Sequence, residues 1–113
     1  MQLYTYKATV KSIYDGDTIR VDIDLGFGLI FKDQALRLLG INTPEIRGEE
    51  KELGLISKRF VEERIPVGSA ITIVTERDRK EKFGRYLATV FYGEGSKNLN
   101  EELLQGGMAK PYE

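Results

Sequence analysis

The amino-acid sequence predicts an α+β domain that is mainly β, with five strands and two helices. Short runs in which apolar and polar residues alternate are typical of half-buried strands. One longer segment carries apolar residues at helical spacing, and a short segment near the end follows a residue suited to cap a helix. The 113 residues, 41% of them hydrophobic, suit one packed core, so we expect a single domain over residues 1–113.

The first two predicted strands cover residues 4–10 and 19–25, and apolar residues occupy every second position of the latter. Asp15-Gly16 lies between them, and glycine there supplies the positive backbone angle of a two-residue hairpin turn. A third strand is predicted from Leu29 to Ile41, after a bend at two glycines. The pattern then breaks at Pro44, which cannot donate to a ladder.

The segment from Glu49 to Arg64 predicts an amphipathic helix, because Leu53, Ile56 and Phe60 share one apolar face that would pack on the sheet. Two more strands follow, and a polar loop over residues 76–84 separates them.

A short helix from Leu99 to Gln105 follows Asn98, a good N-cap residue, with Glu101 three positions on. Five strands with a helix between strands 3 and 4 and a short C-terminal helix is the order of a five-stranded OB-fold barrel. The face of such a barrel commonly binds nucleic acids or sugars.

Composition excludes several kinds of chemistry. The chain has no histidine and no cysteine, which removes Ser-His-Asp and Cys-His catalysis, thiolate zinc sites and disulfides. Any enzyme here must use carboxylates, arginine, lysine, tyrosine or a bound hard cation. A net charge of -1 argues against holding nucleic acid by overall positive field, so phosphate binding would need local positive charge.

The N-terminus has no basic segment followed by an apolar run, and no stretch approaches the roughly 20 apolar residues of a membrane span. We therefore expect a cytoplasmic protein without a membrane partner, although a mature secreted protein whose signal had been removed would look the same. No obligate protein partner is evident, and we expect a monomer.

Two charged residues stand out in the predicted barrel. Asp17 begins the second strand, where a fixed carboxylate suits a hard cation such as calcium. The alternative is a turn whose aspartates merely favour its conformation. Arg37 lies in an apolar strand, and its planar guanidinium matches a phosphate in bidentate fashion. The alternative is an edge charge or a buried salt bridge.

Two later segments could complete a site. In the loop after the third strand, the Asn42 side chain and the Thr43 main-chain carbonyl are possible cation ligands, and Glu45 could act as a general base on water. An ordinary turn is the alternative. Arg85 directly precedes a strand that could fix it, although the charged run before it is usually solvated loop.

The identities and spacing of these motifs resemble the staphylococcal nuclease family. The likeness runs from residues 14–18 through 37–45 to 82–85, and again over 99–101 and 107–110. The likeness covers nearly the entire chain.

The resemblance implies an OB-fold enzyme that cleaves DNA and RNA with one bound calcium ion. The implied metal ligands are Asp17, Asn42 and Thr43, with Asp15 supporting the water shell. The implied catalytic residues are Glu45 as general base, and Arg37 and Arg85 as the two arginines that hold the scissile phosphate. The implied substrate-binding residues are Lys82, Phe83 and Tyr112.

The chain departs from the family's pattern at several of these positions. Asn42 stands where well-known members place a second metal carboxylate, so we expect weaker calcium binding. Phe83 lacks the hydroxyl of the usual tyrosine, and Tyr112 is the tyrosine near the positions that line the family's nucleotide pocket. We expect these changes to affect substrate grip more than reaction type.

Three hypotheses follow for the function. The first is an active calcium-dependent nuclease, and the second is a catalytically weak or inactive nucleic-acid-binding module on the same barrel. The third is a scaffold barrel whose charges are incidental, which leaves Arg37 in an apolar strand without a partner. Cleavage of nucleic acid in the presence of calcium would distinguish the first hypothesis from the second. Any response of the protein to calcium would distinguish both of these from the third hypothesis.

Overall fold

The computed structural model describes residues 3–112, and for Asp78 and Arg79 it describes the backbone alone. Residues 1, 2 and 113 of the predicted domain lie outside this range. The strands are β1 (Thr5–Asp15), β2 (Thr18–Gly26), β3 (Leu29–Leu38), β4 (Ile41–Asn42), β5 (Ala70–Lys80), β6 (Tyr86–Tyr92), β7 (Lys97–Asn98) and β8 (Lys110–Pro111). The helices are a 3-10 turn, η1 (Gly48–Glu50), then α1 (Lys51–Arg64) and α2 (Leu99–Gln105).

The five long strands close into a barrel. They form one sheet in the order β3-β2-β1-β5-β6, with the short β7 paired to β6. Neighbours are antiparallel except at the closure, where β3 and β6 pair in parallel and Arg37 lies opposite Leu87. The prediction of an OB-fold barrel with a helix between the third and fourth long strands is confirmed.

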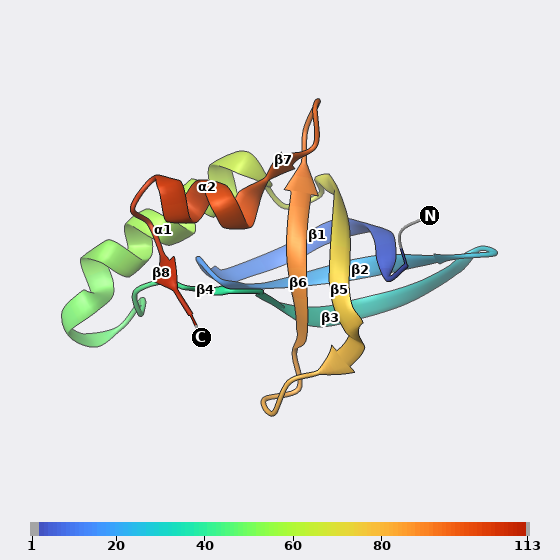
Figure 1. Cartoon of the computed structure of the whole chain (residues 1–113), viewed down its shortest axis with the longest axis horizontal. Coiled ribbons are helices and arrows are strands. Elements are labelled where there is room, and N and C mark those ends of the chain that lie inside the picture. The colour runs from blue at the N-terminus through green and yellow to red at the C-terminus, as the bar shows by residue number, and fades with distance from the viewer. Residues whose placement is uncertain (1–2, 113) are drawn as a thin grey trace.

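Both helices lie at one end of the barrel, beside β4 and β8, while the turn between β2 and β3 points to the other end (Figure 1). The predicted cap of α2 is present, because the Asn98 side chain accepts a hydrogen bond from the Glu101 amide at 3.0 Å. Within residues 3–112, neither helix has the length and apolar character needed to cross a bilayer.

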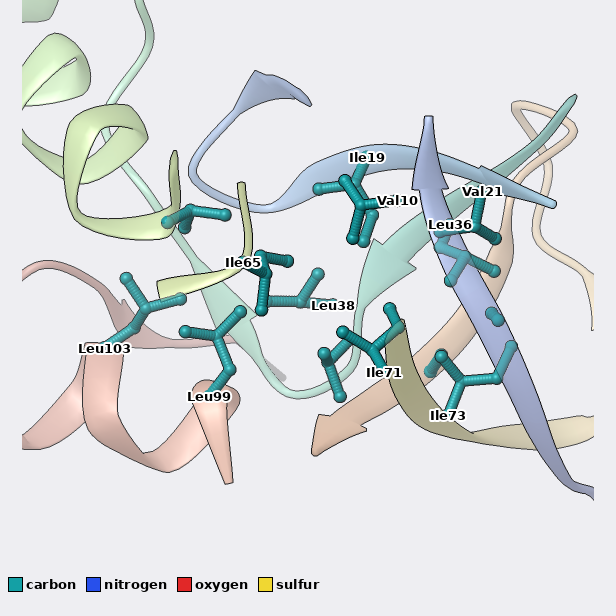
Figure 2. Packing of buried hydrophobic residues seen from close by; sticks show 14 of the residues in the cluster. Val10, Ile19, Val21, Leu36, Leu38, Ile65, Ile71, Ile73, Leu99 and Leu103 are labelled. Atoms are coloured by element: carbon teal, nitrogen blue, oxygen red, sulfur yellow. The ribbon is translucent and has the colours of Figure 1, made fainter. Parts of the chain in front are cut away.

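The core fills the barrel and continues under the helices (Figure 2). The alternating residues predicted to face inward on β2 do so, since Ile19 and Val21 have no exposed surface and Ile23 has 5%. Leu99 and Leu103 of α2 and Ile65 after α1 are fully buried against them. Helix packing therefore extends the barrel core toward the turn between β1 and β2.

The turn between β1 and β2 needs its glycine for a reason other than the predicted one. Gly16 does not have a positive φ, so the expectation of a left-handed glycine in this turn is wrong. A Cβ at Gly16 would instead lie 2.8 Å from Cγ2 of Thr43 and 2.9 Å from Cβ of Ser57. Glycine is required here because the turn packs directly against α1 and the loop after β4.

Three predicted strand boundaries are also wrong. The first strand, predicted over residues 4–10, continues as β1 as far as Asp15, where it pairs with Thr18. The strand predicted from Leu29 to Ile41 is interrupted after Leu38, and Gly40, with φ of 79°, lets the chain resume as β4. The stretch 76–84, predicted as loop, extends β5 as far as Lys80. Strand pairing overrides the polar composition there, since Lys80 pairs with Tyr86.

Helix α1 buries a different face from the predicted one. Its buried residues are Gly54, Ser57 and Val61, whereas Leu53 is 59% exposed and Ile56 is 46% exposed. The reason is the close approach of the backbone of the loop after β4, which small side chains permit and large ones would block. The predicted stripe of Leu53, Ile56 and Phe60 therefore does not pack on the sheet as a unit.

Replacing Gly54 with alanine is expected to destabilise the protein by about 1 to 3 kcal/mol. In an unconstrained helix this change would stabilise by about 1 kcal/mol, because glycine is a poor helix former. Here, however, the new Cβ would lie 2.1 Å from the carbonyl oxygen of Glu45, which is backbone. Denaturant unfolding measures the difference, with the exposed Arg59→Ala as control, expected within about 0.5 kcal/mol. A stabilised Gly54→Ala variant contradicts this packing.

Candidate functional site

Two buried carboxyl groups meet at the turn between β1 and β2. Asp15 ends β1 and Asp17 directly precedes β2, and they are 8% and 6% exposed. The turn is held locally, because the Asp17 amide donates to Oδ1 of Asp15 at 3.0 Å. It is tied to the loop after β4 as well, because the Thr43 amide donates to Oδ2 of Asp17 at 3.0 Å.

Burial raises the pKa of Asp15 to about 7, with the hydrogen bond and the charge of Asp17 as further causes. Two buried carboxyl groups this close together favour the uptake of positive charge, as a proton or as a cation. The turn thus has the electrostatic character of a cation site.

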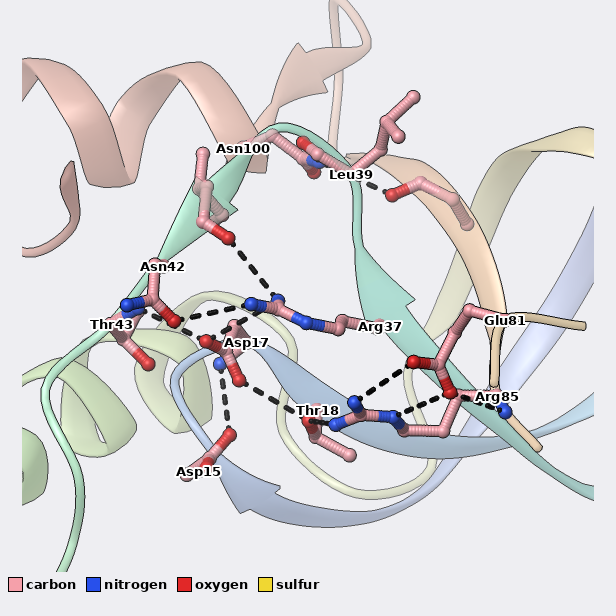
Figure 3. A network of polar contacts seen from close by, with 12 residues as sticks. Asp15, Asp17, Thr18, Arg37, Leu39, Asn42, Thr43, Glu81, Arg85 and Asn100 are labelled. Carbon is pink, nitrogen blue, oxygen red and sulfur yellow. Dashed lines mark hydrogen bonds and ion pairs between the residues drawn. The ribbon is translucent and has the colours of Figure 1, made fainter. Parts of the chain in front are cut away.

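Arg37 joins this turn to the loop that follows β3. Its Nη1 lies 3.4 Å from Oδ2 of Asp17 and donates to the Ile41 carbonyl at 3.2 Å, while Nη2 donates to Oδ1 of Asn42 at 3.1 Å. The arginine is 9% exposed, so its charge is compensated by these acceptors (Figure 3). The buried salt bridge, which was the alternative interpretation of Arg37, is therefore present, and its partner is a residue of the predicted site.

Arg85 reaches the same turn from the opposite side. Its Nε and Nη2 donate to the two carboxylate oxygens of Glu81 at 3.1 and 3.2 Å. Its Nη1 donates to Oγ1 of Thr18 at 3.0 Å, and that hydroxyl donates to Oδ1 of Asp17 at 3.2 Å. All three guanidinium nitrogens therefore take part in hydrogen bonds, which fix the orientation of the group (Figure 3).

Glu81 is held in turn by the backbone. Its Oε1 accepts from the amides of Phe83 and Arg85 at 2.9 and 3.0 Å. The hydrogen bond from Arg85 is the main reason that the pKa of Glu81 lies below its usual value. A charged Glu81 therefore preorganises Arg85.

Both arginines line one hollow of about 340 Å³. The predicted substrate-binding residues Lys82, Phe83 and Tyr112 line it too. Aromatic rings accompany the guanidinium groups, since Cζ of Arg37 lies 4.9 Å from the Tyr112 ring centre and Cζ of Arg85 lies 5.5 Å from that of Phe83. Pairing of β8 with β4 brings Tyr112 here, and its amide donates to the Gly40 carbonyl.

The donors of the turn suit a hard cation. Within residues 3–112, three or more acidic side chains do not converge anywhere in a metal-binding group, so a cation here would rely on the two aspartates with neutral oxygens. One buried oxygen is free for such a role, because Oγ1 of Thr43 has no hydrogen-bond partner among the described residues. Calcium accepts such mixed oxygen sets together with water. The donor set therefore fits calcium with a low charge count.

Glu45 lies next to this network but outside it. Its residue is exposed, and its amide lies 3.5 Å from Oε1 of Glu50. Among residues 3–112, we find no hydrogen bond or ion pair of the Glu45 carboxylate. The structure thus connects Asp15, Asp17, Arg37, Asn42, Thr43 and Arg85, and leaves the predicted base at the edge with its carboxylate in solvent.

Three residues without an assigned role in the sequence analysis hold the site together. Thr18 and Glu81 position Arg85, as described above. Asn100 is buried in α2, where its Nδ2 donates to the Leu39 and Ala88 carbonyls at 3.0 and 3.2 Å, which anchors the turn after β3. The sequence motifs contain Thr18 and Asn100, and Glu81 lies in the charged run before Arg85, but no sequence pattern showed the contacts that these residues make.

Comparison with known proteins links this geometry to one family. The profile of the family described as staphylococcal nuclease homologue matches residues 35–113. An uncharacterized protein of Methanocaldococcus jannaschii is 33% identical over 129 residues, covering 95% of this chain and 59% of that protein.

Two proteins named thermonuclease are also similar to the chain. The protein of Staphylococcus hyicus is 32% identical, covering 94% of this chain and 58% of its own length. The protein of Staphylococcus intermedius is 30% identical, with 89% and 56% covered. The chain therefore spans less than two thirds of the length of these relatives.

Proposed function

The chain belongs to the staphylococcal nuclease homologue family, and from that premise we propose that it is a calcium-dependent nuclease that hydrolyses phosphodiester bonds of DNA, RNA or both. One observation carries the proposal. Two arginines, one in β3 and one directly before β6, are fixed around two buried carboxyl groups, and their hollow is open to a ligand. The names of the two staphylococcal relatives support the same reaction class.

The arginines supply the phosphate contacts in this proposal. Nη2 of Arg85 uses one of its two hydrogens for Glu81, and Nε of Arg37 has no recorded acceptor among the described residues. In this proposal the remaining hydrogens donate to non-bridging phosphate oxygens. Because Glu81 and Asp17 already hold both groups, little reorganisation is needed as negative charge grows in the transition state.

Glu45 is the proposed general base. Its exposed carboxylate accepts a proton from water as the water oxygen attacks phosphorus. The bond from phosphorus to the leaving sugar oxygen then breaks, and that oxygen takes up a proton from solvent. No histidine is needed for this step, because a carboxylate can accept the proton and the arginines stabilise the five-coordinate phosphorus.

Calcium would be held by Asp17, Asn42 and Thr43, with Asp15 behind them. When bound, it offsets negative charge on a phosphate oxygen. The unpartnered Thr43 hydroxyl and the raised pKa of Asp15 support a cation at this place.

A cleavage assay on single-stranded DNA and on RNA tests the proposal. Cleavage is expected with calcium and is expected to stop with EDTA. Intact substrates at every calcium concentration, over neutral to alkaline pH, would exclude a nuclease.

One observation favours the second hypothesis, a nucleic-acid-binding module without turnover. Arg37 donates to Oδ1 of Asn42, so the one amide in the ligand set is already engaged. Salt-sensitive binding of an oligonucleotide without cleavage would identify such a module.

Replacing Asn42 with aspartate is expected to tighten calcium binding about tenfold. The change adds one negative charge to the ligand set, and the new carboxylate still accepts from Arg37. Calorimetric titration of both proteins measures the ratio, and Asn42→Ala should bind more weakly than either. An unchanged affinity in Asn42→Asp would remove residue 42 from the ligand set.

A further inference from the structure

The apolar stripe that α1 does not bury lies beside the candidate site. Leu53 and Ile56 are exposed, although both are large aliphatic residues on the outer face of a helix whose inner face is occupied by glycine and serine. Clustered apolar side chains in solvent next to a reactive loop are typical of a binding surface.

These two side chains line a groove of about 260 Å³. The groove runs between α1, the loop at residues 42–44 and the segment at residues 107–110, and Pro44 and Met108 add further apolar surface to it. Ser57 closes its floor by donating to the Met108 carbonyl at 2.7 Å. The floor is therefore held in place by the fold.

The groove adjoins the hollow of the two arginines. Asn42 lines both depressions, and it is the residue that they share, so they are neighbours on the surface. A phosphate held by Arg37 and Arg85 would have the aromatic rings of Phe83 and Tyr112 on one side and the aliphatic groove on the other. A nucleic acid strand has the matching pattern, with a base on each side of every internal phosphate.

Charge indicates which part of the strand the groove accepts. Its rim carries one acid, Glu50, and one base, Lys110, so it has no excess of positive charge for a phosphate. The apolar walls with few polar groups suit a flat, largely apolar base, and the rim groups can pair with its polar edge.

We propose that this groove is a second nucleoside subsite, which takes the base on the far side of the scissile phosphate from Phe83 and Tyr112. The inference rests on the proposed nuclease function and deepens it.

Short oligonucleotides that carry one abasic residue test this assignment. One substrate lacks the base immediately 5′ of the scored bond, another lacks the base immediately 3′, and a third is intact. The double variant Leu53→Asn/Ile56→Asn is compared with the wild type on all three. Leu55→Asn is the matched control, because Leu55 is an exposed leucine of the same helix outside the groove.

The kcat/KM of the wild type is expected to be about tenfold lower on each abasic substrate than on the intact one, because loss of an apolar contact typically has an effect of this size. The kcat/KM of the double variant on the intact substrate is expected to be about tenfold below that of the wild type. Removal of one of the two bases should then have no further effect on the kcat/KM of this variant, whereas removal of the other base should still lower it. Leu55→Asn should behave as the wild type. Leu53→Asn alone replaces the double variant if circular dichroism shows the latter unfolded.

If removal of either base lowers the kcat/KM of the double variant and of the wild type by the same factor, the groove is not a base subsite. That result would be the same whether the groove is empty or is covered by another protein. Wild-type protein that cleaves no substrate overturns the proposed function instead. The two failures are therefore distinguishable.

Discussion

Glu45→Ala is expected to lower the rate of phosphodiester cleavage by about 10² to 10³-fold while calcium binding and folding persist. The reason is that Glu45 is proposed to accept the proton of the attacking water, and an alanine provides no acceptor. Because its carboxylate is in solvent and is not part of the buried network, its loss leaves no unpaired buried group. Single-turnover cleavage of a labelled oligonucleotide measures the rate.

Glu45→Gln is the control for this prediction. It keeps the size and the polarity of the side chain but cannot accept a proton at neutral pH, so it should be as slow as the alanine variant. Full activity in either variant would remove Glu45 from the reaction. Reduced thermal stability in both would point to a structural role for the loop instead.

Arg85→Ala is expected to cost about 10² to 10³-fold in kcat, since it removes one preorganised donor from the phosphate site. Arg85 is a better probe than Arg37, because it is partly exposed and Glu81, left without its partner, can be hydrated. Removal of Arg37 would leave Asp17 as an unpaired charge in the interior and lower the free energy of unfolding by about 3 to 5 kcal/mol. This loss of stability would make an effect on the reaction rate hard to interpret.

Arg85→Lys separates charge from geometry. A lysine keeps the positive charge but has no planar guanidinium that could donate hydrogen bonds to Glu81, Thr18 and a phosphate at the same time. We therefore expect it to recover little of the lost rate. Recovery close to wild type would show that charge alone suffices and that the Glu81 and Thr18 contacts are unimportant for the reaction.

The sequence was sufficient for the parts of the fold that depend on local pattern. Alternation along β2 placed Ile19 and Val21 in the core, and the side-chain chemistry of Asn98 placed the start of α2. The order of the strands and helices then led to the barrel. These features depend on neighbouring residues, which a linear pattern records.

Features that depend on distant backbone segments were predicted less well. The stripe of Leu53 and Ile56 looks like a core face, yet α1 turns Gly54 inward because the Glu45 carbonyl lies against it. Gly16 is a second example, because glycine is required there by the close approach of Thr43 and Ser57 and not by its backbone angle. No local pattern reveals which segment will approach a glycine.

The residues of the candidate site were predicted individually, but the hydrogen bonds and ion pairs that connect them were not. The structure shows that Thr18 links Arg85 to Asp17 while Glu81 holds Arg85, so the loop before β6 is connected to the turn before β2. It also shows that Asn42 is engaged by Arg37. Calcium binding and phosphate binding are therefore expected to be coupled through shared side chains.

A calcium titration followed by two-dimensional amide NMR tests the central claim, that the turn between β1 and β2 and the loop after β4 form one cation site beside the arginines. The account predicts saturable shifts concentrated at residues 15–18 and 42–43, which disappear in Asp17→Asn. Calcium that leaves those resonances unmoved, or shifts them equally in the variant, would contradict it.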